Sequence, residues 1–307
     1  MTKTSKKIVF FGNERLATGV QTDAPTLQAL IAAGYHVAAV VSNFEVGQSR
    51  KARQLEIAEI AKANHIPLLL PANPAEIKPQ LQALKADVGV LVAYGKIVPQ
   101  SVIDIFPQGI INIHPSLLPK HRGPTPLESV ILDGSQQTGV SIMALSSQMD
   151  AGPIYAQQTV MVGWQETKQQ LADNLLNKGG QMLLAVLPAI LEGKAQAGPQ
   201  DEAQASYDSL IVKADGIIDW HKPAVQLERE VRAYTGWPRS RTTLLGTEVI
   251  ITQAQVSDQA LGSGQVKTDN QQLVVGCGVR SLVIDKLQPA GKTEMTAQAF
   301  LAGNRQL

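Results

Sequence analysis

Residues 109–123 read GIINIHPSLLPKHRG, and this stretch decides how the rest of the chain is interpreted. Residues 110–114 form a short apolar, β-branched run that is closed by Pro115, which is typical of a buried parallel strand where it ends. Asn112 and His114 are the polar residues of this run. Because side chains on a strand alternate with a period of two, both point to the same face near the carboxyl end. Open α/β sheets bind their ligands at that edge.

Two interpretations of the Asn112 and His114 pair are open. The pair could be satisfied polar residues beneath a loop. Against this, a polar pair inside an apolar strand must find partners, because each unsatisfied buried group costs about 1–3 kcal/mol. The residues that follow favour a functional site, because a loop stiffened by Pro119 carries Lys120, His121 and Arg122. A rigid, cationic loop suits an anionic ligand or a phosphate backbone.

Composition limits the classes of protein that the chain can represent. The 307 residues are 44% hydrophobic and 17% charged, with a formal net charge of +1, which allows one large or two medium domains. Any binding of nucleic acid must therefore depend on local basic patches. The single cysteine, Cys277, excludes an internal disulfide and a multi-cysteine metal site. Neither a signal-peptide core nor a membrane-length apolar run is found, so we expect a cytoplasmic protein that does not bind membranes.

The first half of the chain alternates predicted strands and helices. Strands are expected at 7–12 and 36–42 with a helix over 15–34 between them, the pattern of a nucleotide-binding type of α/β sheet. Residues 12–19 read GNERLATG rather than G-x-G-x-x-G, which argues against an NAD-dependent oxidoreductase. The basic segment 43–53 is either a solvated loop or a mobile loop that contacts a polyanion.

A predicted antiparallel pair of strands, 138–145 and 153–162, encloses the turn that contains Asp150. An aspartate in a turn often caps its own backbone. Beside an imidazole, a carboxylate also orients the ring. A long amphipathic helix is predicted over 167–191.

The sequence pattern changes after residue 193. Residues 194–206 have no apolar periodicity and are predicted to be a linker between a first domain, 1–193, and a second domain, 207–307. The second domain begins with a helix over 224–234 and continues with short β-rich runs between glycines. Strands at this spacing suggest a small barrel of the oligonucleotide-binding (OB) type.

The motifs together resemble a known family. Asn112-x-His114, the following SLLPKHRG and the MDAG at 149–152 resemble the enzymes that take a formyl group from 10-formyltetrahydrofolate. In the second half, GWP at 236–238 and LQPAGK at 287–292 resemble the C-terminal domain of the methionyl-tRNA formyltransferase family. The resemblance implies a Rossmann-like formyltransferase domain with a mostly parallel sheet, followed by a small OB-like β-barrel. The first turn departs from the family's Gly-Thr-Pro-Asp-Phe.

The resemblance implies formyl transfer to the α-amino group of the methionyl moiety of initiator methionyl-tRNA. In that chemistry an amine attacks a carbonyl and charge builds on the oxygen. Asn112 and His114 are expected to stabilise that charge, and Asp150 is expected to orient His114 and assist proton transfer. The substrate amine is itself the nucleophile, so no covalent intermediate is needed. His114 and His121 alone make a poor metal site, and no metal is expected.

The resemblance also implies which residues contact the ligands. Residues near the strand ends are expected to contact the folate donor: Tyr94, Gly95, Ser116, Leu117, Leu118 and Pro119. Basic residues are expected to contact tRNA: Arg50, Lys51, Arg53, Lys120, Arg122, Arg239 and Lys292. A monomer is expected.

Two rival functions remain from the sequence. One is formyl transfer to a purine precursor or a nucleotide sugar, which would not require the second domain. The other is a non-catalytic RNA-binding protein built on an inactive α/β domain, against which the presence of Asn112, His114 and Asp150 argues.

Overall fold

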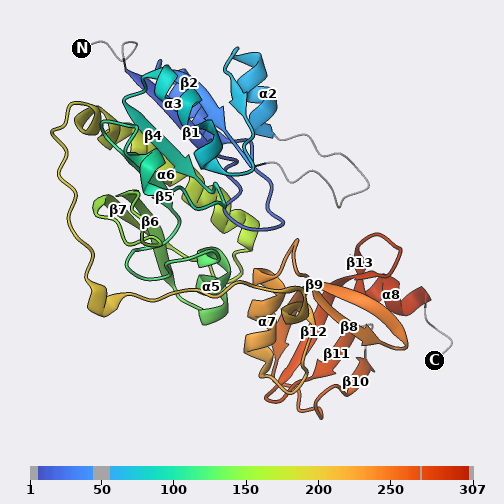
Figure 1. Cartoon of the computed structure of the whole chain (residues 1–307). Helices are drawn as coiled ribbons and strands as arrows, with labels where there is room; N and C mark the ends of the chain where they lie inside the picture. Colours follow the sequence, from blue (N-terminus) through green and yellow to red (C-terminus); the bar gives the residue numbers. More distant parts are fainter. Residues whose placement is uncertain (1–5, 44–55, 270–271, 304–307) are drawn as a thin grey trace. The chain divides into compact units, whose positions relative to one another are not determined.

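The computed structural model describes residues 6–43, 56–269 and 272–303 (Figure 1). The chain divides into two compact units. Unit 1 comprises 1–126, 137–162 and 170–209, and unit 2 comprises 127–136, 163–169 and 210–307. Unit 2 is therefore discontinuous in sequence, whereas the sequence predicts a contiguous second domain over 207–307.

Unit 1 is organised around a mixed sheet. In the described residues its strand order is β3-β2-β1-β4-β5-β6-β7. The strands are β1 (Lys7–Gly12), β2 (His36–Val41), β3 (Leu68–Leu69), β4 (Val88–Val92), β5 (Ile110–His114), β6 (Gln137–Ala144) and β7 (Ile154–Met161). Neighbours from β3 to β5 pair in parallel, whereas β6 pairs antiparallel with both β5 and β7. The predicted, mostly parallel α/β sheet is confirmed.

Helices connect the parallel strands of unit 1. They are α1 (Pro25–Ala32), α2 (Glu56–Ala63), α3 (Lys78–Leu84) with the 3-10 turn η2 (Pro74–Ile77) before it, and α4 (Gln100–Ile103). The long helix α6 (Lys168–Leu191) matches its prediction, and the 3-10 turn η3 (Glu202–Gln204) follows it. The helix predicted from residue 15 is wrong in its start, because the chain becomes helical only at Pro25. Proline at a first helical position has its φ angle already set for a helix.

The centre of the unit 1 sheet is apolar on its covered faces. Val9, Phe11 and Leu91 from β1 and β4 pack with Ile110 of β5 in one buried cluster. Tyr94 joins this cluster, and its ring meets that of Phe11 edge to face with centroids 5.8 Å apart. These central strands are buried because helices cover them, and strands of that kind read as nearly continuous apolar runs.

Unit 2 contains an antiparallel sheet of order β10-β11-β12-β9-β8, with β13 paired to β12, in the described residues. The strands are β8 (Ser240–Leu244), β9 (Thr247–Ser257), β10 (Val266–Asp269), β11 (Gln272–Gly276), β12 (Ser281–Pro289) and β13 (Met295–Thr296). The helical elements are α5 (Pro126–Asp133), whose first residue belongs to unit 1, the 3-10 turn η4 (Lys213–Gly216), α7 (Ala224–Ala233) and α8 (Ala297–Gly303). The antiparallel second half agrees with the predicted fold class.

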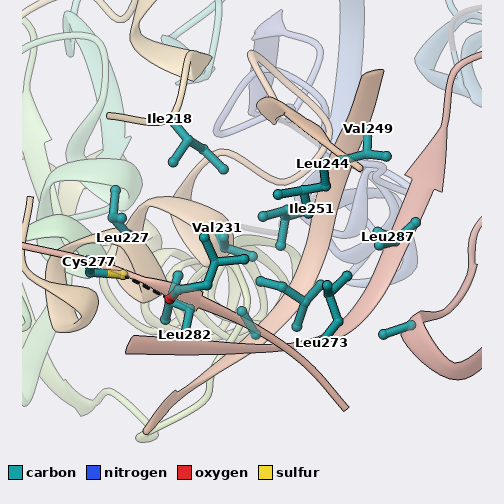
Figure 2. Close-up of a cluster of buried hydrophobic side chains, with 14 of the residues drawn as sticks. Ile218, Leu227, Val231, Leu244, Val249, Ile251, Leu273, Cys277, Leu282 and Leu287 are labelled. Atoms are coloured by element: carbon teal, nitrogen blue, oxygen red, sulfur yellow. Dashed lines mark hydrogen bonds between the residues drawn. The ribbon is translucent and has the colours of Figure 1, made fainter. Parts of the chain in front are cut away.

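The core of unit 2 joins α7 to the inner face of this sheet. Leu227 and Val231 of α7 pack with Ile251 of β9 and Leu282 of β12 (Figure 2). Cys277 is buried in the same cluster, and its Sγ lies 3.6 Å from the carbonyl oxygen of Val275. Burial raises the pKa of the Cys277 thiol to about 11, so this cysteine behaves as a small apolar core residue.

The stretch predicted as a linker is bonded to unit 1. Gly198 forms a two-way backbone bridge with Ile154 in β7. Further along, the Arg122 backbone N–H donates to Ser206 O at 2.9 Å, and the Asp208 N–H donates to Arg122 O at 2.8 Å. Residues 198–208, called the strap below, therefore run along the loop that follows β5.

None of the helices in the described part of the chain combines the length and apolar character needed to cross a bilayer.

Candidate active site

β5 carries two buried polar side chains at its carboxyl end. Asn112 is 6% exposed and His114 is 4% exposed. The strand is held in the sheet by β4 on one side and β6 on the other. The Asn112 side chain makes no hydrogen bond to any residue that the structure describes, so its amide donors and acceptor remain for a ligand. An amide in that position favours a ligand that completes its bonds.

The His114 ring has a different oxygen atom opposite each of its nitrogens. Nε2 lies 2.9 Å from the carbonyl oxygen of His121, and Nδ1 lies 3.7 Å from Asp150 Oδ1. A carbonyl oxygen can only accept, so the hydrogen on Nε2 is assigned by this contact. Nδ1 is therefore the nitrogen that faces Asp150, at a separation longer than a direct hydrogen bond.

Asp150 is positioned by the turn between β6 and β7 and by the loop after β5. Its φ angle is 49°, in the left-handed region that aspartate tolerates better than most residues. Its Oδ2 accepts the backbone N–H of Gly123 at 2.8 Å. Two residues on, a Cβ on Gly152 would lie 1.9 Å from Ala144 O, so only glycine fits there. Oδ1 is left as the carboxylate oxygen that faces His114.

Glu14, in the turn after β1, is a buried carboxylate that the sequence motifs did not indicate. Glu14 is fully buried, and its carboxylate accepts the backbone N–H groups of Thr26 at 2.9 Å and Leu27 at 2.7 Å. These are orphan donors in the first turn of α1, whose N-cap Ala24 makes no side-chain bond. Burial raises the pKa of Glu14 to about 7 against the opposing effect of these bonds.

Glu14 occupies the place where dinucleotide-binding folds hold a phosphate. That place is the amino end of the first helix, which favours negative charge. A carboxylate of the chain already takes these N–H groups, which agrees with the missing glycine fingerprint. The departure of residues 12–16 from the family's first turn was the available signal, but the partners of Glu14 lie 12 and 13 residues away in sequence.

The comparisons with known proteins identify the family. The sequence profile of the formyl transferase family matches residues 6–187, and that of the formyl transferase C-terminal domain matches residues 210–305. A methionyl-tRNA formyltransferase of Methylococcus capsulatus is 37% identical over 301 residues, which cover 96% of each chain. The chain belongs to the methionyl-tRNA formyltransferase family. It is therefore a formyl-group transferase with both domains of that family.

Solved structures share the fold at low sequence identity. An N-formyltransferase from Helicobacter canadensis, in complex with folinic acid and dTDP-3-aminofucose, has a TM-score of 0.69 at 18% identity and covers 91% of this chain and 98% of its own. HypX from Aquifex aeolicus, in complex with tetrahydrofolic acid, has a TM-score of 0.67 at 16% identity over 98% of this chain and 47% of its own. At this level of sequence identity, the similarity shows a shared arrangement of helices and strands.

The residues assigned to the folate donor from the family resemblance fall into two groups. Tyr94, Ser116 and Leu118 have buried side chains, and the Ser116 hydroxyl donates to Lys120 O at 2.6 Å. The Tyr94 hydroxyl has no hydrogen-bond partner in the described residues, and burial raises its pKa to about 12, so it stays protonated. The remaining residues are at least partly exposed: Gly95, Leu117 and Pro119.

The basic residues that are expected to contact tRNA differ in exposure. Lys120, Arg239 and Lys292 are exposed. Arg122 does not fit the assignment, because it is fully buried and its guanidinium already bonds to three side chains of the strap. Its pKa is raised mainly by the hydrogen bond to Glu202. The remaining three assigned residues lie outside the described residues: Arg50, Lys51 and Arg53.

Within the described residues, no group of three or more His, Cys, Asp or Glu side chains is arranged to hold a metal ion.

Proposed function

We propose that this family member transfers the formyl group of 10-formyltetrahydrofolate to the α-amino group of the methionyl moiety of initiator methionyl-tRNA. The observation that carries the proposal is the amide of Asn112, a residue that is 6% exposed and whose side chain has no hydrogen-bond partner among the described residues, beside a histidine that faces Asp150 across 3.7 Å. Family membership supplies the reaction class, and the similarity to methionyl-tRNA formyltransferases over 96% of the chain supports the acceptor.

The reaction needs donors to a developing negative oxygen. In the proposal, the Asn112 amide N–H is one donor to the formyl oxygen, because nothing in the described chain uses it. His114 cannot present Nε2, which is committed to His121 O. Nδ1, when protonated, is therefore the edge of the ring that stabilises the charge.

The reaction also needs a group that takes a proton from the attacking amine. Asp150 Oδ1 is available for this role, because Oδ2 is committed to the Gly123 N–H. The gap of 3.7 Å between His114 Nδ1 and Oδ1 leaves the carboxylate and the imidazole free to exchange a proton through the substrate amine or water. No side chain needs to form a covalent bond with the formyl group.

The folate donor supplies the formyl group and leaves as tetrahydrofolate, and its nitrogen N10 receives the proton that the attacking amine gives up. The residues near the strand ends fit such a donor. The buried Tyr94 hydroxyl, which has no partner among the residues that the structure describes, and the apolar side chains of Leu117 and Pro119 suit a ring with polar edges. We propose that the loops at 94–95 and 116–119 hold it. Ser116 and Leu118 act there by shaping the loop.

The acceptor requires a surface for RNA. We propose that exposed Lys120, Arg239 and Lys292 contact the phosphate backbone of the tRNA, without Arg122. We propose that residues 1–193 form the catalytic domain and that residues 207–307 form the tRNA-binding domain. We also propose that the protein is a cytoplasmic monomer that needs no metal.

Acceptor choice is the experiment that tests this function. Purified protein with 10-formyltetrahydrofolate is offered initiator methionyl-tRNA, a dTDP-amino sugar and a glycinamide ribonucleotide in separate reactions. Tetrahydrofolate release and formylated product should appear with methionyl-tRNA and be at least about 100-fold slower with the other two acceptors. Preferred formylation of the sugar or the ribonucleotide would refute the acceptor and retain the chemistry.

A further inference from the structure

Gln200, in the strap, joins the two loops that position Asp150. Its Nε2 donates to the carbonyl oxygens of Asp150 and Gly152, each at 2.7 Å. Its Oε1 accepts from Arg122 Nε at 3.1 Å and from Arg122 Nη2 at 2.8 Å. One amide thus uses both of its hydrogens and both lone pairs of its oxygen, with the turn after β6 on one side and the loop after β5 on the other.

Arg122 anchors this set of hydrogen bonds, which Gln200 makes to Arg122, Asp150 and Gly152 and which is called the joint below. The guanidinium is fully buried and also donates to Glu202 Oε1 at 2.7 Å, Glu202 Oε2 at 2.9 Å and the Tyr207 hydroxyl at 2.8 Å. The paired Glu202 carboxylate satisfies the charge. A planar, fully bonded guanidinium is a rigid point of attachment.

The joint is connected to Asp150 by two routes. Gly123, which follows Arg122 in the chain, donates its N–H to Asp150 Oδ2. Gln200 bonds the Asp150 carbonyl oxygen directly. Displacement of either loop would therefore change the position of Oδ1 relative to His114 Nδ1.

We propose that Gln200 is a positioning residue for formyl transfer, holding the Asp150 carboxylate at its place opposite His114 through Arg122 and the backbone of residues 150–152. The inference rests on the proposed function for its assay. Gln200 acts on the rate of the chemical step through Asp150 and is given no contact with either substrate.

The side chain that this joint requires is narrowly defined. It must donate to two carbonyl oxygens and accept from a guanidinium, and it must have the length of a glutamine side chain to reach all of them. Glutamate at this position would keep the acceptor for Arg122 but would place a carboxylate oxygen against the Asp150 and Gly152 carbonyl oxygens. Asparagine would keep both functions but would be one bond too short.

Gln200→Glu is the decisive substitution, and Gln196→Glu is its matched control. Gln196 is exposed and its side chain makes no hydrogen bond to a described residue, so the same change of charge there leaves the joint intact. We expect Gln200→Glu to lower kcat for methionyl-tRNA formylation about 10- to 100-fold, because small misplacements of a catalytic group carry costs of this size. KM for tRNA and for the folate should change less than about 3-fold, since no substrate contact is lost.

Gln200→Asn separates positioning from folding. It should lower kcat by a smaller factor than Gln200→Glu, with KM again nearly unchanged and with Tm within about 3 °C of the wild type. Wild-type kcat in Gln200→Glu, equal to that of Gln196→Glu, would overturn the proposal. If kcat, KM and Tm all change together in both Gln200 variants, Gln200 has a merely structural role, and this result would also overturn the proposal.

The wild-type protein distinguishes this inference from the function on which it rests. An inactive wild type refutes the proposed function. An active wild type with undiminished Gln200 variants refutes the positioning role alone.

Discussion

Replacement of Glu14 by glutamine should remove a dependence of stability on pH that the fold builds into unit 1. Glu14 is fully buried at the amino end of α1 and accepts the backbone N–H groups of Thr26 and Leu27. Burial disfavours the charged form and raises its pKa from 4.5 to about 7. Because the side chain is 0% exposed, solvent does not screen this effect.

The direction of the effect follows from proton counting. Between pH 4.5 and about pH 7, the folded protein holds a proton on Glu14 that the unfolded chain has released. Raising the pH therefore favours unfolding. The stabilising contribution is fully present below pH 4.5 and is lost as the pH rises through about 7. The whole shift corresponds to about 3 kcal/mol of unfolding free energy.

Urea unfolding followed by far-ultraviolet circular dichroism measures this contribution. The unfolding free energy of wild type minus that of Glu14→Gln should fall by about 2–3 kcal/mol between about pH 5 and pH 8.5. An exposed control, Glu59→Gln, shows the effect of removing one carboxylate from the surface. A difference that is constant over this range, or that grows toward high pH, would refute the reasoning.

Other contacts lead to predictions for catalysis, core stability and RNA binding. Asn112→Ala should lower kcat/KM about 100- to 1000-fold with an unchanged Tm, because a donor to the developing oxyanion is lost; near-normal steady-state turnover would remove Asn112 from the mechanism. Glu128→Leu should lower the free energy of unfolding by about 3–5 kcal/mol, because it strips the buried Lys168 ammonium, 3.1 Å away, of its carboxylate. The double replacement of Glu128 and Lys168 by leucine should recover most of that loss in urea titrations, whereas additive losses would argue against a coupled pair. Arg239→Ala with Lys292→Ala should weaken tRNA binding and flatten its log–log salt dependence by about 2 in slope, and an unchanged slope in a filter-binding series would exclude both as phosphate contacts.

The sequence predicts the placement of Asn112 and His114 because the physical rules involved are local. A short apolar run that ends at Pro115 indicates a buried strand, and a period of two places both residues on one face. The signal for the pairing of β6 with β7 is also local, because the two strands are joined by a short turn. Asp150 lies in that turn, so its approach to His114 needed only the further pairing of β6 with β5.

Arg122 and Glu14 were not predictable, because their surroundings come from distant parts of the chain. Arg122 belongs to a cluster of cations that reads as an exposed surface, and the side chains that bury it arrive 78 to 85 residues later. The strap that supplies them has no apolar periodicity and therefore resembles a linker. Its order comes from hydrogen bonds to unit 1, which leave no periodic pattern in sequence. Glu14 likewise reads as an ordinary turn residue until α1 is placed beside it.

The central claim is that His114 and Asp150 form the proton-handling pair of a formyl transfer to methionyl-tRNA. Single-turnover formylation of methionyl-tRNA with 10-formyltetrahydrofolate, compared between wild type and Asp150→Asn, tests it most directly. Asparagine preserves the size of the side chain and an oxygen for the Gly123 N–H while it removes the proton acceptor. The proposal predicts formylation by the wild type and a rate about 10²- to 10⁴-fold lower in Asp150→Asn, with tRNA affinity unchanged. An Asp150→Asn protein that formylates at the wild-type rate would contradict it.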